Sequence, residues 1–247
     1  MIVVVHLNYT MHFYGKVAVI ICAFVASLGL LAASANLRLI TVLPTIKELD
    51  LLFIKPAPDK ENDVPFTSQA PEGNWQEPWQ NACEEASIVM IQNFYSEQGL
   101  TIAKAREQIL AIFQLKQDTA PTSKDESMER IAEIINSGNL IWQAHVVDEP
   151  SLDVLKAELS DNHPIIAPVY GPLLNNPNYT NPGPLYHVIV ITGYDDATGE
   201  FITHDPGTEQ GENYRYPYEV LLTALHDYLV NKDYTAGAKR VLFTEPR

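Results

Sequence analysis

The spacing of apolar residues changes partway along the chain, and this change limits the possible folds more than any other feature. Between residues 82 and 138 apolar residues recur at helical spacing, which predicts helices at 82–97, 102–113 and 127–137. From residue 140 the pattern becomes alternating or forms short apolar runs, which are typical of strands. It predicts two further helices, at 151–161 and 218–230, and strands at 140–147, 164–170, 186–194, 201–204 and 239–243. Helices followed by an antiparallel sheet make an α+β domain.

Polar residues mark the predicted ends of these elements. Thr101, Ser127 and Ser151 each precede a helical pattern and are good N-caps, because their hydroxyl accepts from an open N–H of the first turn. Gly138 is a typical helix stop. The turn-forming residues 195–199 lie between two predicted strands, so we expect a hairpin there.

An uncharged apolar stretch, residues 17–35, lies near the start of the chain. At roughly 1.5 Å per helical residue it comes close to the ~30 Å core of a bilayer, so one interpretation is a transmembrane anchor. The other is a signal peptide, since Ala33 and Ala35 match a cleavage site. Either way we expect an extracytoplasmic protein, secreted or held at the membrane by residues 17–35. We expect a linker at 36–63 and the folded domain at 64–247.

Charge and cysteine content exclude several classes of function. Lys and Arg number 16 against 31 Asp and Glu, a formal charge of -15 that would repel a phosphate backbone, so we expect no nucleic-acid partner. The two cysteines, Cys22 and Cys83, cannot form a dense disulfide framework. Neither HExxH nor a pair of CxxC motifs occurs, so we expect no metal and no cofactor.

Cys83 is the residue best placed for covalent chemistry. It lies where a loop rich in Pro, Gly and Asn meets the first predicted helix, and a helix N-terminus favours the reactive thiolate. Glu84 and Glu85 oppose this effect, because neighbouring carboxylates raise the pKa of a thiol. Cys83 alone therefore does not decide between a nucleophile and a small buried side chain.

His187 and Asp205 supply a base and a carboxylate that could orient it. His187 begins the apolar strand at 186–194, and Asp205 closes the next strand across the expected hairpin. If Asp205 pairs opposite His187 or Ile189, both side chains lie on one face of the sheet, within about 8 Å or less. We expect the other histidines of the domain to be structural: His145, His163, His204 and His226.

Three blocks of sequence resemble the peptidase C39-like family, papain-like cysteine peptidases related to the double-glycine leader peptidases of bacteriocin exporters. The blocks are VPFTSQAPEGNWQEPWQNACEEASIVM, HVIVITGYD and FITHDPGT. The resemblance covers roughly residues 64–245 and implies a papain-like fold, with Cys83 as nucleophile, His187 as general base and Asp205 as its orienting carboxylate. Two departures stand out: Glu84 replaces the usual glycine, and Gln69 lies farther from the cysteine than in the leader peptidases.

A papain-like mechanism also needs a donor for the developing oxyanion, usually a glutamine upstream of the cysteine. Gln69, at the end of an expected short strand, is favoured over Gln76 and Gln80 in the loop. We expect an exported cysteine peptidase acting on a peptide or protein substrate through an acyl-thioester. Two alternatives remain open, an acyl transferase of transpeptidase or transglutaminase type and a degenerate peptide-binding module.

Overall fold

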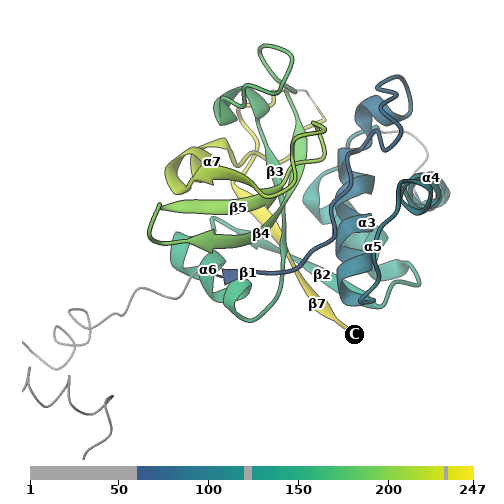
Figure 1. Ribbon diagram of the computed structural model, residues 1–247, viewed down its shortest axis with the longest axis horizontal. Helices are drawn as coiled ribbons and strands as arrows, with labels where there is room; N and C mark the ends of the chain where they lie inside the picture. The colour runs from purple at the N-terminus through teal and green to yellow at the C-terminus, as the bar shows by residue number, and fades with distance from the viewer. Residues whose placement is uncertain (1–59, 120–123, 231–232) are drawn as a thin grey trace, which may run out of the picture. The chain divides into compact units, whose positions relative to one another are not determined.

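The computed structural model describes residues 60–119, 124–230 and 233–247 (Figure 1). The chain divides into two units, residues 1–55 and 56–247, and the described residues all lie in the second. The expected anchor or signal peptide at 1–35 and most of the expected linker lie outside the described residues. Within the described part, no helix is long and apolar enough to cross a bilayer. The last linker residues differ from expectation, because Lys60 and Glu61 pair with a strand of the sheet.

A seven-stranded sheet forms the centre of the domain, and every pairing in it is antiparallel. The strand order is β2-β7-β3-β4-β5-β6, and β1 also pairs with β4. The strands are β1 (Lys60–Glu61), β2 (Trp142–Asp148), β3 (Ile165–Val169), β4 (His187–Asp195), β5 (Glu200–His204), β6 (Tyr214–Pro217) and β7 (Arg240–Pro246). The expected hairpin at 195–199 joins β4 to β5.

The helices begin where the caps predict. The hydroxyl of Ser127 accepts from Arg130 N–H and that of Ser151 from Val154 N–H, and Thr101 accepts from Lys104 N–H. The helices are α3 (Cys83–Tyr95), α4 (Ile102–Thr119), α5 (Met128–Ser137), α6 (Leu152–Ser160) and α7 (Tyr218–Ala224), with short 3-10 turns η1 (Trp79–Asn81) and η2 (Gly171–Leu174). The α+β prediction, helices first and sheet later, is confirmed.

Several predicted elements differ from the structure, among them the helix expected at 102–113, which continues to Thr119. The helix expected at 218–230 ends at Ala224, because Leu225 turns back to form a bridge with Val169 and becomes buried. The short strand expected to end at Gln69 is not formed, and residues 62–69 run as irregular chain. It is held by contacts distant in sequence, such as that of Gln69 N–H with the Pro206 carbonyl at 2.9 Å.

The sheet separates two hydrophobic clusters. Val188 and Val190 of β4 pack with α3, α4 and α5, whereas Ile189 and Ile191 pack with α6 and α7 on the other face. Successive side chains of a strand point to opposite faces, so a strand buried on both sides reads as a continuous apolar run. Figure 1 shows the result, with α3, α4 and α5 on one side and α6 and α7 with β4 and β5 on the other.

Candidate active site

Cys83 is the first residue of α3 and is 4% exposed. The loop before it is held by the buried Trp79 of η1, and no side chain caps the helix. The first N–H groups of any helix lack an intrahelical acceptor, so those of Cys83 and Glu84 are available beside the sulfur. The sequence thus places a thiol among open backbone donors.

The predicted contact between His187 and Asp205 is present. His187 Nε2 lies 2.7 Å from Asp205 Oδ1, and both side chains are buried. The register of β4 and β5 pairs Val190 with His204, so its continuation places Asp205 opposite Ile189. Because Nε2 is engaged, Nδ1 is the ring nitrogen left for a proton from another group.

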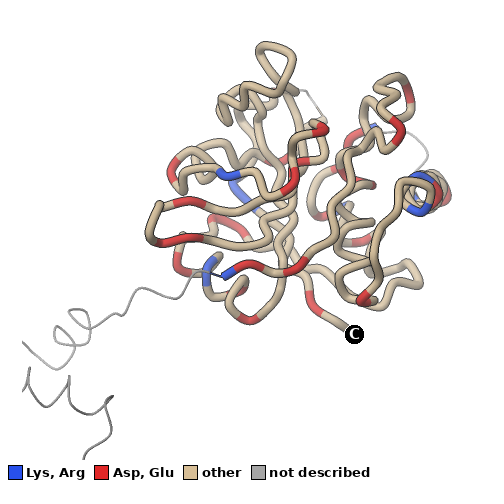
Figure 2. Tube along the Cα trace, in the orientation of Figure 1, with Lys and Arg blue, Asp and Glu red and all other residues tan. Residues whose placement is uncertain are grey.

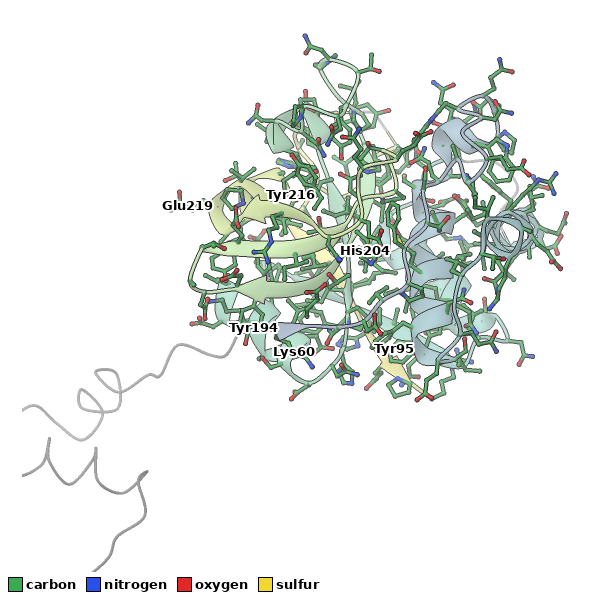
Figure 3. The ribbon with its side chains drawn as sticks, viewed as in Figure 1. Lys60, Tyr95, Tyr194, His204, Tyr216 and Glu219 are labelled. Carbon is green, nitrogen blue, oxygen red and sulfur yellow. The ribbon has the colours of Figure 1, made fainter. Side chains whose placement is uncertain are left out.

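Asp205 has more partners than the sequence suggested. Tyr179 and Tyr216 both donate their hydroxyls to Oδ2, and Asn176 donates to the same oxygen at 3.4 Å. Burial alone would raise the pKa of Asp205, but the charge of His187 and the hydrogen bonds from His187 and the tyrosines outweigh it and lower the pKa. Asp205 therefore stays ionised and fixes the imidazole. Figure 3 shows Tyr216 on the sheet side of the molecule.

Gly207 permits the chain to turn tightly beside the imidazole. Its N–H donates to Asp205 Oδ1 at 3.0 Å, and a Cβ on Gly207 would lie 2.8 Å from two atoms of the His187 ring. A side chain at this position would displace the imidazole. The glycine of the FITHDPGT block is thus explained by close packing.

Cys83 and His187 line the same cleft, which has a volume of about 1050 Å³. Of the five histidines of the domain, only His187 reaches it. No hydrogen bond joins Cys83 to His187 among those of the described residues. Catalytic hydrogen bonds are often long or poorly aligned in the absence of substrate. The absence of this bond is therefore compatible with proton transfer from Cys83 to His187 once substrate is bound.

The other four histidines have structural contacts. His204 Nε2 lies 2.6 Å from the Val64 carbonyl, and its Nδ1 accepts from Asn213 N–H. Burial lowers the pKa of His204, so it stays neutral. Figure 3 shows His204 between the sheet and the chain that leads to α3. His145, His163 and His226 contact Phe243, Glu158 and the Ala224 carbonyl respectively.

The surroundings of Cys83 favour the neutral thiol. Burial raises its pKa well above the ordinary value, and the charges of Glu84, Asp125 and Glu85 add to the rise. A hydrogen bond from Val188 N–H acts in the opposite direction. The helix N-terminus therefore does not produce a resting thiolate, and the proton of Cys83 must be removed by a base during attack.

The two glutamates after Cys83 share a buried lysine, which the sequence reasoning missed. Lys116 Nζ lies 2.5 Å from Glu84 Oε2 and 2.7 Å from Glu85 Oε1, and all three side chains are at most 5% exposed. Lys116 continues the buried stripe of Ile109 and Ile112 on α4. A lysine within an apolar helical stripe was the available signal for a buried ion pair.

Comparison with known proteins agrees with the geometry. The model of the Peptidase C39-like family matches residues 61–235. The chain belongs to this family. A C39-like peptidase from Bacillus anthracis has a similar solved structure, with a TM-score of 0.51 and 14% identity, covering 77% of this chain and 99% of that chain. The peptidase domain of Streptococcus ComA, a bifunctional ABC transporter of a quorum-sensing pathway, has a TM-score of 0.41 and 14% identity, covering 68% and 93%. No curated protein matches the sequence.

The fold of this C39-like family member is papain-like, but the glutamine favoured as oxyanion donor is engaged elsewhere. Gln69 Nε2 donates to the carbonyls of Trp79 and Gln80, both at 2.9 Å, so neither of its N–H groups is spare. Gln69 and Gln80 both line the cleft with Cys83, and Gln80 is the exposed one of the two. Gln76 is exposed and is not among the lining residues.

The buried glutamates of this C39-like domain predict a pH-dependent stability. Burial is the main cause that raises the pKa of Glu84 from 4.5 to about 8. The folded state therefore binds more protons than the unfolded state between those values, and the free energy of unfolding falls as the pH rises through them. The fall is at most about 5 kcal/mol for this group.

Urea unfolding at several pH values between about 5 and 8 measures this effect. Glu84→Gln is expected to flatten the decline, whereas Glu133→Gln, at a carboxylate that is 65% exposed, is expected to leave it unchanged. Equal slopes for wild type and Glu84→Gln would contradict the assignment.

Proposed function

We propose that this chain is a cysteine peptidase that hydrolyses peptide bonds with Cys83 as nucleophile, His187 as general base and Asp205 as the group that orients His187. One observation carries the proposal: the buried His187–Asp205 pair opens onto the same cleft as Cys83, with Nδ1 of His187 unused by Asp205. Family membership supports the same reaction class.

The steps follow from the charges at the site. His187 Nδ1 takes the thiol proton as Cys83 Sγ bonds to the substrate carbonyl carbon, giving a tetrahedral oxyanion. The imidazolium, held by ionised Asp205, then protonates the leaving amine as the C–N bond breaks. Water, deprotonated by His187, attacks the resulting thioester and releases the acid and the thiol. A base is needed throughout because burial raises the pKa of Cys83.

We propose that the Cys83 backbone N–H and the Gln80 side chain donate to the oxyanion. Gln80→Ala is expected to lower kcat by about 10²- to 10³-fold, with little change in Tm because the side chain is exposed. Gln69→Ala is expected to lower the free energy of unfolding by about 1–3 kcal/mol, since it leaves two carbonyls without their donor. If Gln69→Ala loses kcat without a loss of Tm, and Gln80→Ala stays active, then Gln69 and not Gln80 is the oxyanion donor.

The charge of the cleft predicts a preference among peptides. Asp125 and Glu209 line it, and the described lining residues include no Lys or Arg. Figure 2 shows that acidic residues also predominate over basic ones across the rest of the domain. Peptides with Lys or Arg near the scissile bond are expected to be cleaved about two- to fivefold faster than matched Glu peptides, less so at high salt. Glu209→Gln should reduce the ratio of the cleavage rates of basic and acidic peptides. Glu212→Gln, which is outside the lining, should leave this ratio unchanged. A ratio of one at every salt concentration would contradict the predicted preference.

Product analysis on a peptide mixture tests the reaction itself. Hydrolysis predicts free carboxyl products that do not change when a primary amine is added, whereas an acyl transferase would give amide products.

The acidic surroundings of Cys83 favour a second candidate, a peptide-binding module that lacks turnover. That module predicts retention of peptides that is equal in wild type and Cys83→Ala, with no cleavage of any of them.

We also propose that the domain acts outside the cytoplasm. The support is the uncharged stretch at 17–35, read as a signal peptide or an anchor. Cell fractionation and N-terminal sequencing test this, and a cytoplasmic protein that keeps its N-terminus would contradict it.

A further inference from the structure

Cys83 and His187 come from two elements that pack on each other, and a chain of hydrogen bonds joins these elements next to both residues. Cys83 begins α3 and His187 begins β4. Glu84 Oε1 accepts from Glu126 N–H at 2.7 Å, and the Glu126 carbonyl accepts from the Tyr186 hydroxyl at 2.9 Å. This bridge, Glu84–Glu126–Tyr186, starts one residue after Cys83 and ends one residue before His187.

Both ends of the bridge are held in place. Glu84 is 1% exposed, and its other oxygen is fixed by Lys116, which also donates to the Lys124 carbonyl at 3.1 Å. The Tyr186 ring packs against the helical core cluster and meets Tyr228 edge-on, with ring centroids 5.3 Å apart. Burial raises the pKa of Tyr186, so its hydroxyl stays protonated and is always a donor.

Gln69 makes a second connection on the other flank of Cys83. Its side chain holds the carbonyls of Trp79 and Gln80 just before the nucleophile. Its backbone N–H donates to the Pro206 carbonyl, next to Asp205, at 2.9 Å. The residues on both flanks of Cys83 are therefore tied to the segments that carry His187 and Asp205.

We propose that Glu84 and Tyr186 are positioning residues that set the separation of Cys83 Sγ and His187 Nδ1 through the backbone of Glu126. The inference rests on the Cys83–His187 pair of the proposed function. Proton transfer needs hydrogen-bond reach, and a misplacement of about 1 Å can cost about 10²-fold in rate. This positioning role accounts for a glutamate directly after the nucleophile, although an ionised Glu84 disfavours the thiolate.

Removal of one hydroxyl tests the bridge in the full-length protein. Tyr186→Phe is expected to slow iodoacetamide labelling of Cys83 at pH 7 about tenfold, measured by mass spectrometry of the Cys83 peptide. The control is Tyr95→Phe, which removes a hydroxyl bonded to the Thr244 carbonyl at 2.8 Å. Tyr95 lies at the other end of α3 (Figure 3). At 1.5 Å per helical residue it is about 18 Å along the helix from Cys83. The control should label at the wild-type rate.

The same substitution in a His187→Ala background separates positioning from mere access to the thiol. If Tyr186 acts through His187, then Tyr186→Phe should change labelling less than twofold when the imidazole is absent. An equal slowing in both backgrounds, or a Tyr186→Phe that labels like Tyr95→Phe, would overturn the positioning role. Labelling of wild type that is indifferent to His187→Ala would instead contradict the proposed function itself.

A pair of variants at the other end tests the bridge without the tyrosine. Glutamine and methionine at position 84 are both uncharged at every pH and similar in size, but only Glu84→Gln retains an oxygen that can accept from Glu126 N–H. Glu84→Met is expected to label about tenfold more slowly than Glu84→Gln. Equal rates for the two variants would contradict the bridge.

Discussion

Replacement of Cys83 with alanine is expected to lower kcat by about 10⁴-fold or more, the largest effect of any single substitution in this domain. The reason is that no acyl-thioester can form without the sulfur, and Cys83 is the only cysteine that lines the described cleft. Steady-state hydrolysis of a peptide substrate found in the mixture assay measures the loss. Binding of that peptide should persist, because the cleft keeps its shape.

The other cysteine of the chain provides the control for this prediction. Cys22 lies in the apolar stretch at 17–35, so Cys22→Ala is expected to retain the wild-type kcat. Turnover in Cys83→Ala at more than about a tenth of the wild-type rate would show that catalysis does not pass through Cys83.

Replacement of Asp205 has the second largest expected effect, because it acts on both activity and stability. Asp205 is fully buried and accepts from His187, Gly207 and two tyrosines. Asp205→Ala leaves these donors unpaired and is expected to cost about 3–5 kcal/mol of folding free energy. Asp205→Asn keeps the shape, so we expect a smaller loss of stability and a fall in kcat of about 10⁴-fold from a misoriented imidazole.

Asp196→Asn is a matched control for that experiment. Asp196 also accepts from a tyrosine hydroxyl, that of Tyr218 at 2.9 Å, but it does not line the cleft. It is expected to change Tm slightly and kcat not at all. Thermal unfolding and steady-state kinetics are both needed, and equal kcat for Asp205→Asn and wild type would remove Asp205 from the mechanism.

Much of the fold could be predicted because the signals are local. Ser127 and Ser151 cap their helices as expected, since a cap depends on residues only three positions away. The His187–Asp205 contact could also be predicted, because a short hairpin fixes the register of β4 and β5. The end of α7 could not be predicted, because the helix ends where Leu225 forms a bridge with Val169 of β3.

The remaining parts of the candidate site depend on contacts distant in sequence. Tyr179 and Tyr216 reach Asp205 from a loop and from β6, and no sequence pattern aligns those segments. Lys116 pairs with Glu84 because α4 packs on α3. The sequence alone does not reveal this packing, so it indicates only that the charges of Glu84 and Glu85 oppose a thiolate. The position of Gln69 before the cysteine favours it as oxyanion donor, but the orientation of its amide is set by the Trp79 and Gln80 carbonyls.

The most direct test of the central claim is the dependence of Cys83 reactivity on His187. The rate of iodoacetamide labelling at Cys83 is measured at pH 7 in wild type, in His187→Ala, and in His145→Ala as a control at an exposed histidine of β2. We predict that His187→Ala slows labelling by about 10²-fold or more while His145→Ala leaves it unchanged. Equal rates in all three proteins would contradict the Cys83–His187 pair.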